Sequence, residues 1–469
     1  MSEPPAPDTL RSQVLRGGLH LGLRQLIGLL INVAGVLLLT RALGPGAYGR
    51  YAAALGLFTA LQLIAQLGIG VYLVRSERPV ERADLDVAAS LFALFGLAAL
   101  AVGALVAPWF GRSTRIEGVS GTAIALLVGL PLINVGQVAA AQLDRALDFK
   151  RIAWIELSGQ SLFFAVSVPL AFAGLGSWAP VAGWWCQQLV LLIGSSWAAR
   201  YVPRPAWQPA LAREMLGYGF SYSLSIWIYQ LRRLVNPLIV GRYMGAEAVG
   251  IVSLTTQIVT QLGFAGVIAW RMSTATLARV QSSAERLVRA ISGGMWLQAL
   301  VVGPMLCLFA WLGPVLLPLL LGKSWEPLAG LYPYLALGFL ANSMFVLHSS
   351  ALYVVRRNLA VGIVHALQLA LLFGVAAALV PRGGLLGYGA AEAATIASYP
   401  LMHTFVRRYL GAPAYGRALA VTCAFGFALF YDPLGWVSVL GVLALACVLP
   451  FWPATRTLVA DLRAAAVGS

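Results

Sequence analysis

Apolar runs long enough to cross a lipid bilayer recur along this chain of 469 residues, from Leu19 to Trp452. A hydrocarbon core about 30 Å thick is crossed by about 20 apolar residues in a helix. In lipid every backbone amide must find its hydrogen-bond partner within the segment, so these runs are predicted to be helices. A transmembrane β-barrel would show segments of about ten residues with alternating polarity, and that pattern is absent from the sequence. We therefore expect an all-α polytopic membrane protein.

The composition agrees with this fold class. Hydrophobic residues make up 60% of the chain and charged residues only 10%, whereas soluble domains carry about 25% charged residues. The net charge of +15 raises the alternative of a nucleic-acid partner. The arginines are spread over many short loops rather than gathered on one soluble face, a distribution that reports membrane topology instead. We expect no nucleic-acid partner.

We predict about fourteen transmembrane helices, with short loops between them. The predicted spans are residues 19–40, 48–74, 87–110, 119–141, 152–173, 178–199, 215–240, 246–270, 288–311, 328–355, 359–380, 385–406, 414–431 and 433–452. The apolar stretch from Gly313 to Leu321 is short and contains Pro314 and Pro318. We interpret it as an extension of the ninth helix or a re-entrant piece.

The distribution of basic residues predicts which side each loop faces. With fourteen spans, 22 of the 32 Lys and Arg residues fall in loops on one side and 7 in loops on the other. Basic loops are retained in the cytoplasm, so both termini are expected there. The four cysteines lie in apolar runs without a CxxC pair, and no metal-ligand spacing, Walker A sequence or GxSxG motif occurs. We expect neither a metal centre nor a catalytic site.

A nine-residue motif occurs twice in the chain. Arg41–Gly49 and Arg242–Gly250 share Arg, Gly, Ala and Gly at a constant offset of 201 residues. Each copy lies in the turn after the first helix of a six-helix block, and six is an even number, so both blocks have the same orientation in the membrane. This predicts two parallel six-helix repeats plus two C-terminal helices.

The predicted domain organisation follows from the spans and the repeat. It comprises a cytoplasmic N-terminal segment at 1–18, an N-lobe of helices 1–6 at 19–199, a cytoplasmic linker at 200–214, a C-lobe of helices 7–12 at 215–406, helices 13 and 14 at 407–452, and a cytoplasmic tail at 453–469.

Polar side chains inside the predicted spans are the candidates for a substrate site. A charge at the bilayer centre costs at least about 2.5–3.5 kcal/mol, so such residues usually face the bundle interior or water. The first helix carries Arg24 and Asn32 on one polar stripe, because residues four or eight apart share a face. The equivalent stripe of the seventh helix carries Arg233 and Asn236, with Arg232 beside it. We predict that both stripes line one central cavity. The alternative is that Arg24 snorkels to the headgroups while Arg232 and Arg233 pair with a buried acid.

Other polar residues near the membrane allow two readings each. Arg271, at the cytoplasmic end of the eighth helix, is either a substrate contact at the portal or a topology anchor. Glu392 is a candidate for neutralising an arginine or carrying a coupling proton, and Glu156 fits a surface role as well as a coupling role. The histidines within or near spans, His348, His365 and His403, are interpreted as hydrogen-bonding packing residues in preference to the alternative of proton carriers. The pair Gln62 and Gln66 either lines a path for sugar or joins helices.

Three segments resemble the Wzx-type polysaccharide flippases of the multidrug/oligosaccharidyl-lipid/polysaccharide exporter superfamily. They are Leu43–Gly49, Leu61–Arg75 and Leu321–Leu328, and the similarity extends over nearly the whole chain. The resemblance implies transport of undecaprenyl-pyrophosphate-linked oligosaccharide (O-antigen or exopolysaccharide repeat units) across the bacterial inner membrane by alternating access. The resemblance implies no cofactor and leaves coupling to a proton or sodium gradient open. The partners that it implies are membrane lipids, the lipid-linked substrate and polysaccharide polymerase or export machinery.

The positive charge of the residues predicted to line the cavity agrees with the anionic substrate that this resemblance implies. Arginine binds phosphate through a planar, bidentate fork, so a cavity with Arg24, Arg232 and Arg233 suits pyrophosphate and suits cationic drugs poorly. A lipid II flippase of the same superfamily remains an alternative. A membrane-embedded polysaccharide polymerase or ligase is the alternative from another class. Such enzymes usually need a large periplasmic loop, and the longest predicted here, 312–327, is mostly apolar. We expect the chain not to be an enzyme.

The predicted topology can be tested by labelling single cysteines in a variant that lacks the four native ones. A cysteine at Arg75, Arg204 or Arg356 should react with an impermeant maleimide only from the cytoplasmic side, and one at Lys323 only from the periplasmic side. Reaction of both sets from the same side would contradict the fourteen-helix plan.

Overall fold

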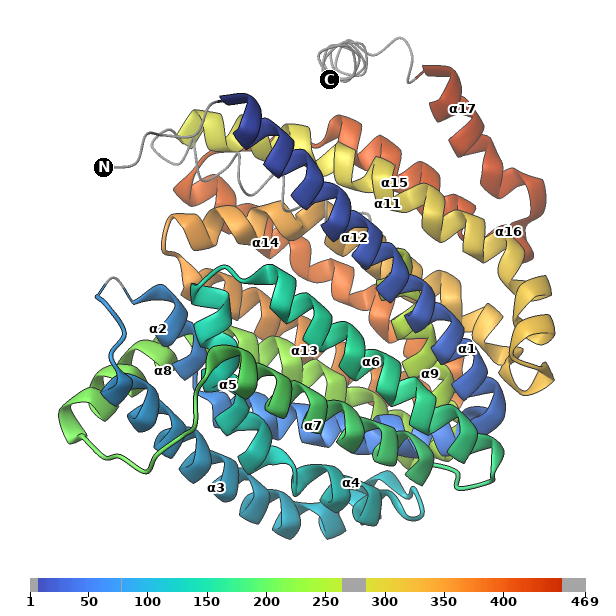
Figure 1. The fold of residues 1–469 in the computed structure, drawn as a ribbon. Coiled ribbons are helices and arrows are strands. Elements are labelled where there is room, and N and C mark those ends of the chain that lie inside the picture. The colour runs from blue at the N-terminus through green and yellow to red at the C-terminus, as the bar shows by residue number, and fades with distance from the viewer. Residues whose placement is uncertain (1–6, 77, 264–283, 449–469) are drawn as a thin grey trace. The chain divides into compact units, whose positions relative to one another are not determined.

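The computed structural model describes residues 7–76, 78–263 and 284–448, and the side chains of 7–26 and 218–226 lie outside this description. The described chain is helical throughout (Figure 1). Its α-helices are α1 (Pro7–Gln66), α2 (Ile69–Arg75), α3 (Arg82–Thr114), α4 (Val119–Leu127), α5 (Leu130–Arg145), α6 (Phe149–Phe172), α7 (Trp178–Ala199), α8 (Pro209–Leu231), α9 (Arg242–Leu262), α11 (Ala284–Leu320), α12 (Pro327–Val354), α13 (Asn358–Ala394), α14 (Tyr399–Tyr409), α15 (Gly416–Ala428), α16 (Tyr431–Leu434) and α17 (Leu440–Val448).

Short turns of tighter or wider helix join several of these elements. They are η1 (Arg232–Leu234), η2 (Asn236–Gly241), η3 (Lys323–Trp325), η4 (Thr395–Ser398) and η5 (Gly435–Val439). The stretch containing Pro314 and Pro318 continues α11 to Leu320, as an extension of the ninth predicted helix. No separate span is formed there.

Three of the long helices contain a break at a glycine. Gly44 in α1 has φ 68° and ψ 170°, Gly245 in α9 has φ 83° and ψ −171°, and Gly384 in α13 has φ 56° and ψ −134°. Glycine adopts positive φ at little cost because it has no Cβ. At Gly44 the two halves of α1 turn back on each other (Figure 1). Dividing the helices at these breaks, and joining the short elements that continue a neighbouring helix, gives about fourteen helices over the described chain, which confirms the predicted fold class.

The breaks in α1 and α9 support the internal repeat. Gly44 and Gly245 are separated by the 201-residue offset of the motif and have nearly the same backbone angles. The last glycines of the two motif copies, Gly49 and Gly250, lie against each other. A Cβ on Gly49 would lie 2.6 Å from the Gly250 nitrogen and against the carbonyl of Ala246. A Cβ on Gly250 would lie 3.0 Å from the Gly49 nitrogen and against the carbonyl of Pro45. The contact is reciprocal, since Pro45 and Ala246 are also one offset apart.

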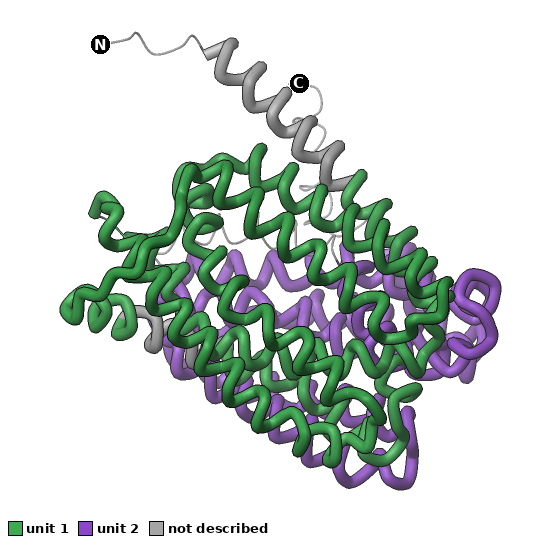
Figure 2. Tube along the Cα trace, turned by 60° about the horizontal axis from the view of Figure 1, so that its bottom comes forward, with its two compact units in different colours: residues 1–250 green, residues 251–469 purple. Residues whose placement is uncertain are grey.

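The chain forms two compact units, residues 1–250 and 251–469 (Figure 2). The boundary between these two units falls within α9, and the predicted lobes at 19–199 and 215–406 remain a prediction. In the first unit, a buried cluster joins α2, α3, α5 and α8 around Ile69, Phe92 and Met215. In the second unit, a buried cluster joins α11, α12, α13 and α14 around Ile291, Leu347 and Val406.

Large apolar side chains cover the outside of both units. Leu105 is 81% exposed and Val315 is 72% exposed, which a protein surrounded by water would not sustain over many residues. Exposed aromatic residues lie near both ends of α6 and α7. They include the tryptophans Trp154, Trp178 and Trp197. Tryptophan is enriched at the two bilayer interfaces. The structure is that of a multi-pass membrane protein.

The reciprocal glycine contact predicts that neither position accepts a larger side chain. Gly49→Ala and Gly250→Ala should each destabilise the purified protein by about 1–3 kcal/mol, the usual cost of overpacking. Gly46→Ala is the matched control, because a Cβ there meets open space within the same turn. The measurement is the melting temperature in detergent. Equal melting temperatures for the Gly46, Gly49 and Gly250 variants would show that the contact is not tight.

Candidate functional site

The arginine pair of the seventh predicted helix lies where the helix changes its geometry. α8 ends at Leu231, Arg232 and Arg233 form the tight turn η1, and the wide turn η2 begins at Asn236. Pro237 contributes to this change because it has no amide hydrogen to donate to the preceding turn. Wide π-type turns inside helices occur frequently at functional sites. Arg233 is exposed and Arg232 is half-buried, so both side chains are held at an irregular point of the helix.

Asn236 has a different setting from the arginines. It is 8% exposed, and its amide Nδ2 donates to the carbonyl of Val249 at 3.3 Å. This bond ties η2 to α9 beyond the Gly245 break. Asn236 therefore helps to fix the backbone on the two sides of the Gly245 break. A contact between Asn236 and the substrate remains a prediction.

The first helix meets α6 through part of its predicted polar stripe. The Gly28 carbonyl accepts a hydrogen bond from Gln160 Nε2 at 3.2 Å, and a Cβ on Gly35 would overlap the ring of Phe164. Asn32, between these glycines, is half-buried. The side chain of Arg24 lies outside the described residues, so its predicted position in a cavity remains a prediction.

The second half of α1, beyond Gly44, borders the seventh helix. Trp227 Nε1 of α8 donates to the Leu63 carbonyl at 2.9 Å, and a Cβ on Gly56 would lie 3.8 Å from the carbonyl of Arg233. The predicted pairing of the two polar stripes across one cavity remains a prediction. Arg271 lies outside the described residues.

The two acidic candidates for coupling have contrasting surroundings. Glu156 is exposed and lines a cavity of about 270 Å3 in the first unit, together with Asp144 and Gln188. Glu392, in the second unit, is 8% exposed and accepts a hydrogen bond from the Tyr388 hydroxyl at 3.0 Å. A coupling role for either residue remains a prediction.

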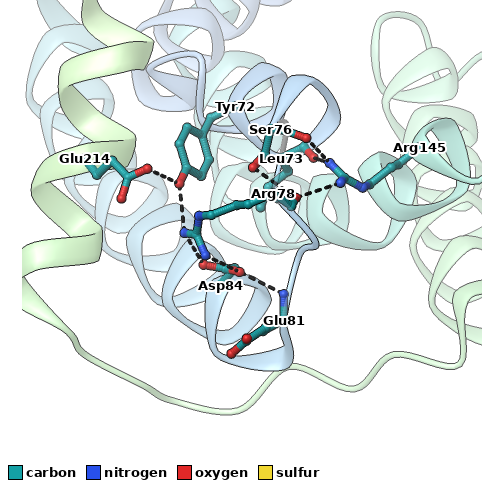
Figure 3. Close-up of polar contacts among 8 residues, drawn as sticks. All are labelled: Tyr72, Leu73, Ser76, Arg78, Glu81, Asp84, Arg145 and Glu214. Carbon is teal, nitrogen blue, oxygen red and sulfur yellow. Dashed lines mark hydrogen bonds and ion pairs between the residues drawn. The ribbon is translucent and has the colours of Figure 1, made fainter.

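A polar network at one end of the first unit was not recognised in the sequence (Figure 3). Arg78 donates to both carboxylate oxygens of Asp84, at 3.2 and 2.7 Å, and to the Tyr72 hydroxyl at 3.0 Å. Tyr72 in turn donates to Glu214 Oε1 of α8 at 2.7 Å. The hydrogen bonds with Tyr72 and with Asp84 raise the pKa of Arg78, which stays charged. The network joins α2, α3 and α8.

Arg145 closes the same loop from the end of α5 (Figure 3). Its guanidinium donates to the carbonyls of Leu73, Ser76 and Arg78, at 3.1, 2.9 and 2.9 Å. The sequence pattern places Arg78 and Arg145 among the basic loop residues that indicate membrane topology, and it predicts no network around them. The one available signal was the spacing of Glu81 and Asp84 at the start of α3, typical of a helix cap, and the Glu81 amide does donate to Asp84 Oδ2 at 2.8 Å.

The linker after α7 is also held to α3. The Tyr201 hydroxyl and the Arg204 amide both donate to Asp86 Oδ1, at 3.0 and 3.2 Å. Burial raises the pKa of Tyr201, so its hydroxyl keeps its proton and acts as a donor. Arg82 forms an ion pair with the other oxygen of Asp86 at 3.5 Å. The linker is therefore fixed at its beginning.

Two histidines of the second unit share one hydroxyl group. His348 Nε2 of α12 and His403 Nδ1 of α14 lie 2.8 and 2.9 Å from the hydroxyl of Tyr415, just before α15. A hydroxyl can donate to one imidazole and accept from the other. The histidines thus join three helices, in agreement with their interpretation as packing residues.

Comparison with known proteins gives the family and the fold. Residues 38–330 match the profile of a family described as polysaccharide biosynthesis protein. The chain is 27% identical over 325 residues to the succinoglycan biosynthesis transport protein ExoT of Rhizobium meliloti (strain 1021), which covers 66% of this chain and 62% of ExoT. It is 26% identical over 235 residues to the amylovoran biosynthesis protein AmsL of Erwinia amylovora, covering 49% of this chain and 59% of AmsL. The matches span about three fifths of the length of these relatives.

Two solved structures share the fold. The lipid II flippase MurJ in an inward closed conformation superposes with a TM-score of 0.73 over 95% of this chain and 99% of MurJ, at 12% identity. An inward-facing multidrug resistance transporter of the MATE family superposes with a TM-score of 0.60 over 80% of this chain and 95% of its own, at 17% identity. At these identities the likeness shows the fold alone.

The network around Arg78 predicts a stability effect that an exposed ion pair does not have. Arg78→Ala should lower the melting temperature in detergent by several degrees, because it leaves the buried carboxylate of Asp84 without its cation. Arg151→Ala is the control, since Arg151 is 62% exposed and its partner Asp148 is 28% exposed, and pairs near the surface contribute little. Equal melting temperatures for the two variants would show that the network does not stabilise the first unit.

Proposed function

The chain belongs to the polysaccharide biosynthesis protein family, and from this we propose that it is a flippase for undecaprenyl-pyrophosphate-linked oligosaccharide. Two observations support the proposal. The relative ExoT carries the name of a biosynthesis transport protein for succinoglycan, and the fold over nearly the whole chain is one that transporters use.

The observation that carries the mechanism is the position of Arg232 and Arg233. Two guanidinium groups in adjacent positions at a helix irregularity present several N–H donors with little backbone freedom. Arginine recognises phosphate by paired, parallel hydrogen bonds and stays charged at every physiological pH. We assign to this pair, with Arg24, the binding of the pyrophosphate in a basic central cavity, and to Arg271 an earlier contact at the portal.

We place the protein in the bacterial inner membrane with both termini in the cytoplasm. The positive bias of the predicted cytoplasmic loops supports this orientation. The proposal treats residues 19–199 and 215–406 as two lobes that alternate between access from the cytoplasm and access from the periplasm. A substrate can only shift such an equilibrium if it binds the two states with different affinity.

The energy for transport is assigned to an ion gradient, with Glu392 and Glu156 as candidates for the coupling group. Glu392 is the favoured candidate for the coupling group, because it is buried beside a tyrosine hydroxyl whereas Glu156 is exposed. Polysaccharide polymerase or export machinery is the partner that would consume the transported unit. The names of the two relatives favour a polysaccharide repeat unit over lipid II.

The substrate assignment predicts that both charge and geometry at Arg24 and Arg233 matter. Arg24→Ala and Arg233→Ala should each reduce export of lipid-linked sugar by about tenfold or more, and lysine at either site should restore it only in part, because ammonium lacks the bidentate fork. Export is measured in cells and normalised to membrane protein level.

Arg382→Ala is the matched control for this measurement. Arg382 is an exposed arginine beside the glycine break in α13, and its removal should leave export near the wild-type level. Full export by the double variant Arg24→Ala with Arg233→Ala would refute the proposed pyrophosphate site.

A further inference from the structure

The helix of the second predicted span, 48–74, is interrupted in its last third. α1 ends at Gln66 and α2 begins at Ile69, and the two residues between them, Leu67 and Gly68, have φ of 44° and 66°. Positive φ is rare for a branched apolar residue such as leucine. The break interrupts the helical hydrogen-bond ladder, and lipid cannot replace the lost partners. Interrupted helices at membrane depth occur where they border protein or a polar cavity.

A cavity of about 420 Å3 lies at this break, within the first unit. Its wall includes the break itself at Gly68 and residues of α1, α2, α3, α5 and α8. Polar and aromatic lining comes from Gln66, Arg75, Gln137, Asp144 and Trp227. Cavities of about 300–1,000 Å3 accommodate small organic ligands. The space is therefore large enough for one sugar ring with its hydroxyl groups.

The chemistry of the wall distinguishes this cavity from a phosphate site. The formal charges of Arg75 and Asp144 cancel, whereas a site for an anion would carry excess positive charge. Each glutamine amide supplies a donor and an acceptor, which is the combination that a hydroxyl group requires. The Trp227 indole is fixed by its bond to the Leu63 carbonyl at 2.9 Å, and it presents an amphipathic ring to the cavity. The lining fits a neutral polyhydroxylated ligand.

The position of the cavity relates it to the arginine pair. Trp227 and Arg233 lie six residues apart on the seventh helix, roughly 9 Å at 1.5 Å per residue. A pyrophosphate and the sugar bonded to it together span a length of this order. A ligand that contacts both places would have its charged group at η1 and its sugar beside the break.

We propose that this cavity is a sugar-binding subsite, which holds a neutral hexose or N-acetylhexosamine ring of the lipid-linked oligosaccharide. The inference rests on the proposed function, because it takes the pyrophosphate to be bound at Arg232 and Arg233. It assigns Gln66 and Gln137 as the residues whose amides hydrogen-bond the sugar hydroxyls. The Gln66 assignment decides between the two readings of the Gln62 and Gln66 pair, since Gln66 lines the cavity and Gln62 does not.

The test is equilibrium binding to the full-length protein in nanodiscs. The probes are undecaprenyl pyrophosphate without sugar and three forms that carry one glucose, one galactose or one N-acetylglucosamine. The wild type should bind at least one glycosylated form about tenfold more tightly than the sugar-free lipid, as expected when buried polar groups gain partners. Gln66→Leu with Gln137→Leu should abolish this difference and leave the affinity for the sugar-free lipid unchanged.

Gln62→Leu is the matched control, an amide one turn earlier on α1 that should keep the full difference. Trp227 is left unchanged, because its substitution would also remove the bond to Leu63. Equal binding of all four lipids by the wild type, or a difference that survives in the double variant, overturns the sugar subsite. If Arg233→Ala still weakens the sugar-free lipid in that case, the proposed function stands without the subsite. If the wild type binds none of the lipids, both proposals fail.

Discussion

The need to satisfy every backbone amide away from water governs the whole of this structure. Lipid offers no hydrogen-bond partners, so the described chain is helical nearly throughout, and its long helices depart from regular geometry at only a few points. These points are informative because each one has a local cause. Gly44, Gly245 and Gly384 allow turns that other residues resist. Two further irregularities, at Leu67 with Gly68 and at Arg232 to Gly241, coincide with the polar groups assigned to substrate. The same constraint that makes the fold regular thus also marks where function can reside.

Close approach of backbones gives the repeat its structural meaning. The motif copies end in Gly49 and Gly250, and each glycine lies against the backbone of the other copy. Small residues allow helices in membranes to approach until their backbones touch, and dispersion then replaces the hydrophobic effect as the source of attraction. The identity of the final glycine in both copies is explained by this contact. The matching angles of Gly44 and Gly245 are explained by the turn that brings the contact about.

The arginines of this chain perform two physically different tasks. Arg78 and Arg145 lie at one end of the first unit, where they neutralise Asp84 and satisfy the carbonyls of the loop between α2 and α3. Arg78 is paired with a carboxylate and Arg145 is held by backbone carbonyls, so both side chains join segments of the protein to one another. Arg232 and Arg233 follow a different pattern, because they occupy the irregular turn η1 inside a span, and a charge at that depth is costly unless it serves a ligand or a buried partner. The net charge does not separate these tasks, since both kinds of arginine contribute equally to it, whereas their place in a loop or inside a predicted span does.

The sequence by itself determined the fold class, the approximate helix positions and the repeat, because span length and hydrophobicity are local properties that the bilayer thickness sets directly. It also singled out Arg232 and Arg233 as candidates for a substrate site, since an arginine inside an apolar run is visible without any coordinates. Only the tertiary structure decided which distant groups meet. The bond from Tyr72 to Glu214, the hydroxyl shared by His348 and His403, and the cavity that joins Gln66 to Gln137 and Trp227 all link residues on separate helices. Such contacts depend on how helices rotate and pack against one another. A helical stripe predicts which residues share a face, but the packing of the other helices decides what that face meets.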